Sequence, residues 1–320
     1  MDPDSTRPQG EGEYLIVTVM RGLGLVLVLA GMVGAAGLPA GTSLPRWQLD
    51  AAEQAQPAQR RPLTIRELTD LAFGAGASAR IRRSDRPPWT VLSDSPGYDD
   101  RALLSRLDRT YQQVRQDFPF LGDARLPAAL LVFPTRAAAR GFLTRLATHL
   151  GGPIDVPADF AGLSLLGIGI VWTDEFTAAQ LERISVHEAT HALTQQLFDI
   201  EHVPSWFAEG VAERAELLVD GVNVTPRIRA LLASGQIPPL ATLLDSRRIP
   251  GHGYLPAALL IDWLLADPLR RSQLPQFFRD AQAQPSPNLL PLLQRRMGIS
   301  VDDLERGWGR WLAEKFGPAR

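Results

Sequence analysis

The sequence predicts an α+β fold, with a small sheet in the first half of the chain and helices in the second. Short apolar runs typical of strands alternate with longer amphipathic segments up to about residue 176, and beyond that point the periodicity is helical. Strands that come early and helices that follow are the pattern of an α+β protein. With 320 residues, 45 % of them hydrophobic, the chain can bury one sizeable core or two small ones.

The N-terminal segment is predicted to direct the protein to its location rather than to join the fold. Residues 23–40 are uncharged, rich in Leu, Val, Gly and Ala, and close to the length of a minimal membrane span. Residues 1–40 are therefore interpreted as a signal peptide or membrane anchor, with a buried helix or disordered leader as the alternative. Residues 41–62 are interpreted as a linker. We expect an exported protein of the cell envelope, anchored in the membrane or secreted.

Periodicity and turn residues predict the remaining elements in order. In the first half we expect a helix over 64–73, an irregular Gly- and Arg-rich segment over 74–88, a strand over 89–93, a helix over 99–118, a strand over 126–133, a helix over 135–150 and strands or a hairpin over 163–172. In the second half we expect helices over 225–233, 240–244, 255–266, 273–281, 289–296 and 301–315.

A long helix is predicted between these halves, over 177–198, where no Pro or Gly interrupts the chain. Either Thr177 or Asp174 is expected to cap its start. Its apolar side chains recur at spacings of three and four and mark a buried face: Val186, Ala189, Leu193 and Leu197.

The sequence His187-Glu188-Ala189-Thr190-His191 lies in this helix, and its polar residues fall on a different face. Two histidines four residues apart point the same way, since four residues turn about 400°. Both imidazoles can then reach one metal ion at about 2.0–2.1 Å. Glu188 can lie beside that metal and take a proton from its water. The alternative is a pair of histidines exposed on an amphipathic helix.

A zinc hydrolase needs a third protein ligand and an open position for water. The next predicted helix offers Glu209 and Glu213, which are four residues apart and share a face. Beside a dication, one carboxylate can ligate while the other hydrogen-bonds a ligating histidine. We expect this helix to start at an N-cap on Ser205 and to stop at Asp220-Gly221. Its inward-packing residues are expected to be Phe207, Val211 and Leu218.

Composition limits the chemistry further. The chain has no cysteine, which excludes disulfides, thiolate zinc sites and cysteine nucleophiles, so any metal is held by nitrogen and oxygen ligands. The formal net charge of −2 provides no basic surplus for nucleic acid, and no nucleic-acid partner is expected.

The segments H-E-A-T-H at 187–191 and P-S-W-F-A-E-G-V-A-E at 204–213 resemble the gluzincin branch of the zinc metallopeptidases, in particular the bacterial peptidase-MA-like families. In those families H-E-x-x-H is followed by a helix reading W-x-x-E-G-x-A-E. The site that this resemblance implies consists of one zinc ion per chain on His187, His191 and Glu209, with Glu188 as general base and Glu213 as the carboxylate that supports a ligand.

The resemblance also implies a zincin-like domain over 63–320, in which a small sheet lobe (about 89–176) precedes the active-site helix and a mostly helical lobe (about 204–316) follows it. Gluzincins stabilise the tetrahedral oxyanion with a tyrosine or histidine from the downstream lobe. Tyr254 is the candidate here and His252 the alternative; a turn residue without a role is equally compatible with the sequence.

The resulting hypothesis is a zinc-dependent peptidase that acts on a peptide or protein substrate. The apolar run 163–172 is expected to offer an edge strand for an extended peptide. A hypothesis of another class is a catalytically silent, peptidase-like module that binds or scaffolds at the cell envelope. The presence of every ligand residue argues against it, because a silent module is free to lose Glu188 or a histidine.

Overall fold

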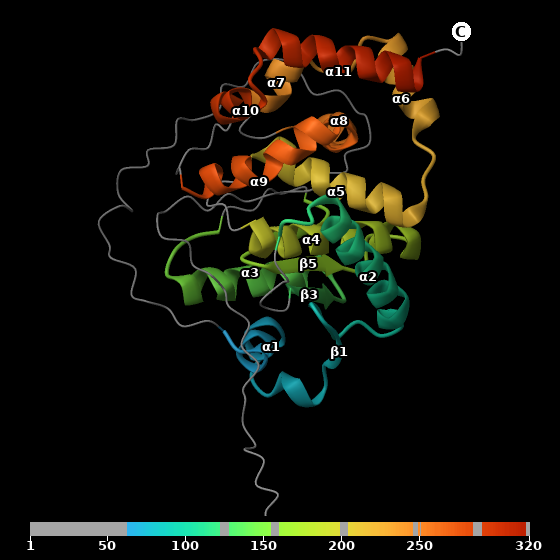
Figure 1. Ribbon diagram of the computed structural model, residues 1–320. Coiled ribbons are helices and arrows are strands. Elements are labelled where there is room, and N and C mark those ends of the chain that lie inside the picture. The colour runs from blue at the N-terminus through green and yellow to red at the C-terminus, as the bar shows by residue number, and fades with distance from the viewer. Residues whose placement is uncertain are drawn as a thin grey trace, which may run out of the picture.

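The computed structural model describes residues 63–121, 128–154, 160–198, 204–245, 249, 251–283 and 290–317. The predicted leader at 1–40 and linker at 41–62 lie outside these residues. Within them the protein is α+β, as predicted, with a five-stranded mixed sheet and a helical C-terminal part. Figure 1 shows these parts as stacked layers, with α4 and α5 between the sheet and the later helices.

The sheet has the strand order β1-β2-β3-β5-β4. β2 is parallel to β3 and β3 to β5, while both outer strands pair antiparallel to their neighbours. The strands are β1 (Arg82–Arg86), β2 (Trp89–Ser93), β3 (Ala128–Phe133), β4 (Leu163–Leu165) and β5 (Ile168–Trp172). β4 and β5 form the hairpin predicted over 163–172.

β1 corrects the expectation that residues 74–88 are irregular. Its sequence, Arg-Arg-Ser-Asp-Arg, has no apolar alternation and is mostly exposed, so it lacks the period-two signal of a half-buried strand. It becomes a strand because its backbone pairs with β2 from Arg82 opposite Ser93 to Arg86 opposite Trp89. The same segment also contains a short 3-10 helix, η1 (Ala77–Ala79).

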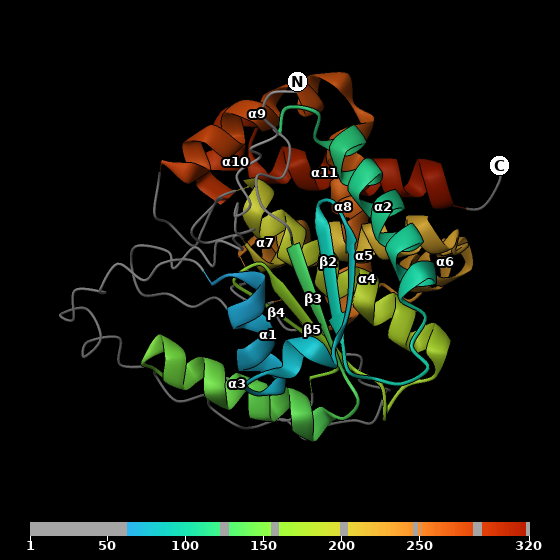
Figure 2. The same cartoon turned by 90° about the horizontal axis from the view of Figure 1, so that it is seen from below.

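Side chains of the central strands alternate between two apolar layers, as the pleat of a sheet requires. Leu131 and Phe133 of β3 pack with α1 and α3, whereas Leu130 and Val132 pack with α2 and α4. Figure 2, seen from below, shows α1 and α3 in front of the sheet and α4 and α5 behind it. The helices are α1 (Ile65–Phe73), α2 (Asp100–Asp117), α3 (Arg136–Leu150) and α4 (Ala178–Phe198).

Polar side chains at the helix starts accept hydrogen bonds from first-turn amides that otherwise lack a partner. Thr64 caps α1, Asp99 caps α2 and Thr135 caps α3. The Thr177 hydroxyl accepts from the Gln180 amide at the start of α4, which confirms the first of the two predicted caps. The second candidate, Asp174, instead accepts from the Arg136 amide at the start of α3.

The helical part encloses the largest apolar cluster of the described residues. It comprises α5 (Ser205–Asp220), α6 (Thr225–Ala233), α7 (Leu240–Asp245), α8 (Tyr254–Ala266), α9 (Pro268–Gln282), α10 (Leu290–Met297) and α11 (Val301–Phe316), with a 3-10 turn, η2 (Gly251–Gly253). Phe207 and Val211 are buried in this cluster as expected, but Leu218 is 48 % exposed. Leu218 lies in the last turn of α5, just before the helix ends at Gly221.

The start of α5 also differs from expectation. Ser205 is the first helical residue rather than the N-cap, and the preceding Pro204 provides no side-chain cap. The Ser205 hydroxyl accepts a hydrogen bond of 3.1 Å from the backbone amide of Ile249. A contact with a residue 44 positions away in sequence has therefore replaced the local cap.

α5 and α8 cross in close contact at Gly210. A Cβ built at this position would lie 2.7 Å from the carbonyl oxygen of Ala257, a distance that backbone atoms cannot tolerate without moving. α8 begins with Tyr254 and α5 carries Glu209, so this crossing fixes how the two residues approach each other.

We predict that Gly210→Ala lowers the free energy of unfolding by about 1–3 kcal/mol, because the added methyl group overpacks the crossing. The matched control is Gly309→Ala in the exposed middle of α11, where a Cβ meets no heavy atom within 4 Å. That change should instead stabilise the protein by about 0.4–1 kcal/mol, through reduced entropy of the unfolded chain. Urea unfolding of both variants measures the difference, and equal effects would contradict the close crossing.

Candidate metal centre

Three ligand atoms converge between α4 and α5. The Nε2 atoms of His187 and His191 lie 3.1 Å apart, and Glu209 Oε2 lies 3.2 Å from the first and 3.4 Å from the second. All three side chains are buried. The structure thus brings together the three residues that the sequence analysis proposed as ligands, and they could hold a metal ion.

The spacing of these atoms fits a tetrahedral cation. With metal–ligand bonds of about 2.0–2.1 Å, tetrahedral geometry separates the ligand atoms by about 3.3–3.4 Å. The three observed separations, 3.1, 3.2 and 3.4 Å, lie close to that value. A donor set of two imidazoles and one carboxylate suits zinc and other divalent transition metals.

The charge of the surroundings favours a cation as well. Four carboxylates are buried around this centre, on Glu188, Glu209, Glu213 and Glu216. Buried charges are stable only when they are paired or coordinate a metal. Arg183 contacts Glu216, and its single positive charge does not balance the group. Either protons or a cation must supply the remainder.

Burial and the neighbouring charges shift the pKa values of the two histidines and of Glu209. Burial lowers the pKa of His191. Burial also acts to lower the pKa of His187, but its hydrogen bonds with Glu209 and Glu216 outweigh that effect and raise the pKa well above its ordinary value. Burial acts to raise the pKa of Glu209, yet the two histidines bring it below its ordinary value. The centre therefore stabilises positive charge beside an ionised Glu209.

Glu188 is buried near these residues but is not one of the three candidate ligands. It is fully buried, and neither of its carboxylate oxygens has a hydrogen-bond partner in the described part of the protein. Burial raises its pKa to about 8, and the charges of Glu209 and Glu216 act in the same direction. An unpartnered buried carboxylate that follows His187 in sequence and interacts electrostatically with His187 and Glu209 is suited to accept a proton from a group at the centre.

The backbone leaves room for Glu188 at Gly162, immediately before β4. A Cβ at Gly162 would lie 2.7 Å from Glu188 Cγ and 2.8 Å from its Oε1. Only a residue without a side chain permits this approach. The base candidate and the start of an edge strand of the sheet are therefore in direct contact.

Ion pairs between the part of α4 that precedes His187 and the part of α5 that follows Glu209 contribute to the packing of the two helices. Arg183 on α4 donates from Nε to Glu216 Oε1 on α5 at 2.7 Å. Arg106 of α2 contacts Glu182 on α4 at 2.9 Å and also pairs with Asp220 at the end of α5. These contacts link three helices that are separated in the sequence, and they hold the two ligand-bearing helices side by side.

Glu216 is a residue that the sequence analysis did not single out. Its Oε2 lies 3.4 Å from His187 Nδ1, in the position where a supporting carboxylate was expected from Glu213. Glu213 is buried in the same group, with its carboxylate within 4.8 Å of the facing atoms of His187 and Glu216. The spacing 209, 213 and 216 places all three carboxylates on one helix face, and this signal would have identified Glu216.

The two oxyanion candidates occupy different environments. The Tyr254 ring stacks beside the His187 ring, with centroids 5.8 Å apart and planes inclined by 17°. Tyr254 is the first residue of α8, one position before the start predicted at residue 255. His252 lies in η2 and is exposed. Tyr254 is thus the candidate that the fold places next to the ligands.

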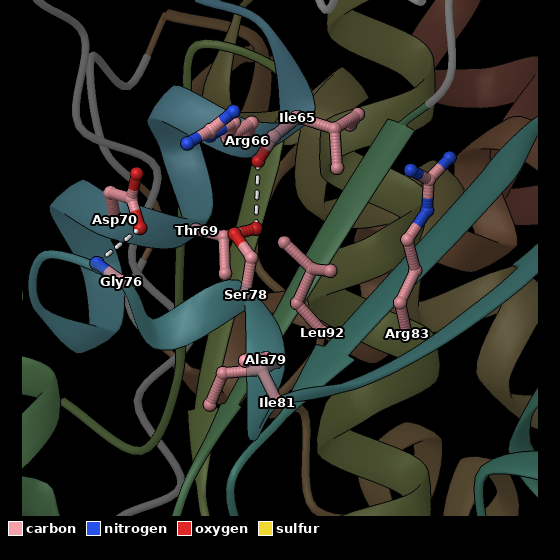
Figure 3. A pocket seen from close by; sticks show the side chains of 10 residues that line it. All are labelled: Ile65, Arg66, Thr69, Asp70, Gly76, Ser78, Ala79, Ile81, Arg83 and Leu92. Carbon is pink, nitrogen blue, oxygen red and sulfur yellow. Dashed lines mark hydrogen bonds between the residues drawn. The ribbon is translucent and has the colours of Figure 1, made fainter.

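A cavity of about 430 Å³ lies elsewhere, between α1, η1, β1 and β2 (Figure 3). Its lining includes Arg66, Asp70 and Arg83, and the Asp70 carboxylate accepts a hydrogen bond from the Gly76 amide. None of the residues of the metal centre lines this cavity.

Comparison with known proteins identifies no relative. No family model matches the chain, and neither a curated protein nor a solved structure matches it. None of the helices in the described part of the chain combines the length and apolar character that a membrane span requires.

We predict that the purified protein binds about one divalent metal ion per chain after loading with Zn²⁺ and desalting. His191→Ala should abolish tight binding, because it removes a ligand, while the control His149→Ala, on the exposed side of α3, should retain it. Elemental analysis measures the metal content. Metal at a free concentration 100 times its Kd should also stabilise the folded protein by about 2.7 kcal/mol. Unchanged binding in His191→Ala would refute the centre.

Proposed function

We propose that this protein is a zinc-dependent peptidase of the gluzincin type with a zincin-like fold, holding one Zn²⁺ on His187, His191 and Glu209. The observation that carries the proposal is the unpartnered, buried carboxylate of Glu188 beside three atoms at tetrahedral ligand spacing. Metal-assisted hydrolysis needs a cation and a base, and the sequence pattern H-E-x-x-H supplies two ligands for the cation and the base from neighbouring residues.

Zinc, when bound, would polarise the scissile carbonyl and lower the pKa of water at the centre. Glu188 accepts the proton from the attacking water as its oxygen bonds to the carbonyl carbon, and delivers that proton to the amide nitrogen as the C–N bond breaks. Burial raises the pKa of this carboxyl, and a cation bound beside it would act in the opposite direction by favouring the ionised form that accepts a proton. Tyr254, beside His187, is proposed to donate a hydrogen bond to the oxyanion.

An extended peptide is the proposed substrate. β4 is an edge strand of the described sheet, and Gly162, at its start, is in contact with Glu188. The three residues of β4 are buried, so a peptide could pair with the outer edge of β4 only after the groups that cover this edge move aside. It would then pass the base, and its main-chain groups would bind without a requirement for particular side chains.

Two substitutions separate metal binding from chemistry. Glu188→Gln should retain zinc, because Glu188 is not a ligand, and should reduce peptide hydrolysis by about 10²–10⁴-fold because the base is lost. Glu209→Ala should lose zinc together with activity. Metal content and cleavage of a peptide library are measured on the same preparations.

The outcomes discriminate between the two hypotheses of function. Cleavage by Glu188→Gln at the wild-type rate would overturn the mechanism. A wild-type protein that binds zinc and cleaves no peptide would instead favour a catalytically silent binding or scaffold module at the cell envelope.

We also propose that the domain is exported and acts outside the cytoplasmic membrane, either anchored or secreted, because segment 23–40 is uncharged and close to the length of a span. An alkaline phosphatase fusion after residue 60 should be active, since that enzyme requires export. A cytoplasmic reporter at the same junction should be inactive. The reverse pair of results would refute export and leave the zinc centre unaffected.

A further inference from the structure

The ligand His187 has a second set of contacts, on the side of its ring away from the other ligands. Its Nε2 faces His191 and Glu209, while its Nδ1 lies 3.4 Å from Glu216 Oε2. The other oxygen of Glu216 accepts from Arg183, at 2.7 Å from Nε and 2.5 Å from a terminal nitrogen. The side chains of Arg183, Glu216 and His187 thus form a continuous chain of polar contacts, which we call the row.

This row joins the same two helices that supply the ligands. Arg183 precedes His187 by one turn of α4, and Glu216 follows Glu209 by two turns of α5. The Glu216 side chain is 5 % exposed, whereas that of Arg183 is 34 % exposed, so the row leads from solvent to the buried centre. Because the row spans both helices, the orientation of the His187 ring depends on how α4 packs against α5.

We propose that Arg183 and Glu216 are a pair of positioning residues for His187: Glu216 accepts the Nδ1–H of the imidazole and Arg183 holds Glu216 in place, so that Nε2 is directed at the metal. This inference rests on the proposed zinc centre. A carboxylate in this position orients the ring and makes the ligand more basic, and its loss typically weakens metal binding by about 10–100-fold.

His187, Glu213 and Glu216 also form a group whose atoms lie close enough for a second metal ion. Arg183 argues against that use, because its guanidinium is in contact with Glu216 and would repel a dication there. Glu213 has no ion pair or hydrogen bond of its own with His187 among the contacts of the described residues, although it is buried beside Glu216. It therefore serves as the matched control, with the same chemistry on the same helix.

The experiment measures Zn²⁺ affinity of the whole protein by competition with a chromophoric chelator. Glu216→Gln should weaken binding by about 10–100-fold, and Glu213→Gln, which removes the same negative charge but no contact with the His187 ring nitrogen, should weaken it by clearly less. Arg183→Gln should weaken binding by less than Glu216→Gln. Because Arg183 acts through Glu216, the double variant should match Glu216→Gln within about twofold.

A second readout reports the hydrogen bond itself and does not depend on activity. In the Co²⁺-substituted protein, each ligating histidine has a ring N–H whose proton signal is shifted by the metal. Glu216→Gln should move one of the two signals and speed its exchange with solvent, and Glu213→Gln should leave both unchanged. Circular dichroism of the metal-free variants confirms that each is folded.

Each result bears on the proposal. Equal losses in Glu216→Gln and Glu213→Gln, or a double variant whose loss is the product of the single losses, would overturn the pairing of Arg183 with Glu216. Two zinc ions per wild-type chain would favour the second-metal interpretation. If the wild type binds no zinc, the zinc centre and the pair fail together. If it binds zinc and Glu216→Gln does so equally well, only the pair fails.

Discussion

The burial of negative charge between α4 and α5 is the constraint on which the rest of the structure depends. Four carboxylates and two imidazoles are enclosed where these helices meet. Such a group is unfavourable in a low-dielectric interior unless positive charge accompanies it. A divalent cation on His187, His191 and Glu209 would offset much of this negative charge, and the three atoms are close enough together to hold one. A metal bound here would therefore also stabilise the packing of α4 on α5.

The sheet and the outer helices hold these two helices in place. α4 packs on the face of the sheet formed by residues such as Leu130 and Val132, and α5 is buried against α8 at Gly210. Both surroundings are apolar and closely packed, so neither helix can turn to expose its carboxylates to water without loss of packing. Rigid placement of this kind is what a site needs when its ligand atoms must meet within a few tenths of an ångström.

The candidate metal centre lies between the sheet side and the helical side of the fold, and each side contributes a neighbour to it. Glu188 contacts Gly162 at the start of the edge strand, and His187 has Tyr254 on its other side, at the start of α8. The two candidate functional neighbours thus come from opposite parts of the chain.

Local patterns in the sequence determined much of this protein: the α+β order, the bounds of α4 to within one residue, the end of α5 at Gly221 and the pair His187 and His191 as candidate metal ligands, whereas the choice of Glu209 over Glu213 came from the family resemblance. Periodicity, caps and motif spacing are properties of neighbouring residues, and they act before the chain folds. Only the tertiary structure decided the rest. β1 exists through pairing with β2, Ser205 is engaged by Ile249, and Glu216 rather than Glu213 reaches His187 Nδ1. Each depends on how segments distant in sequence cross, because the crossing of α4 and α5 selects which of several carboxylates on one helix face meets the histidine.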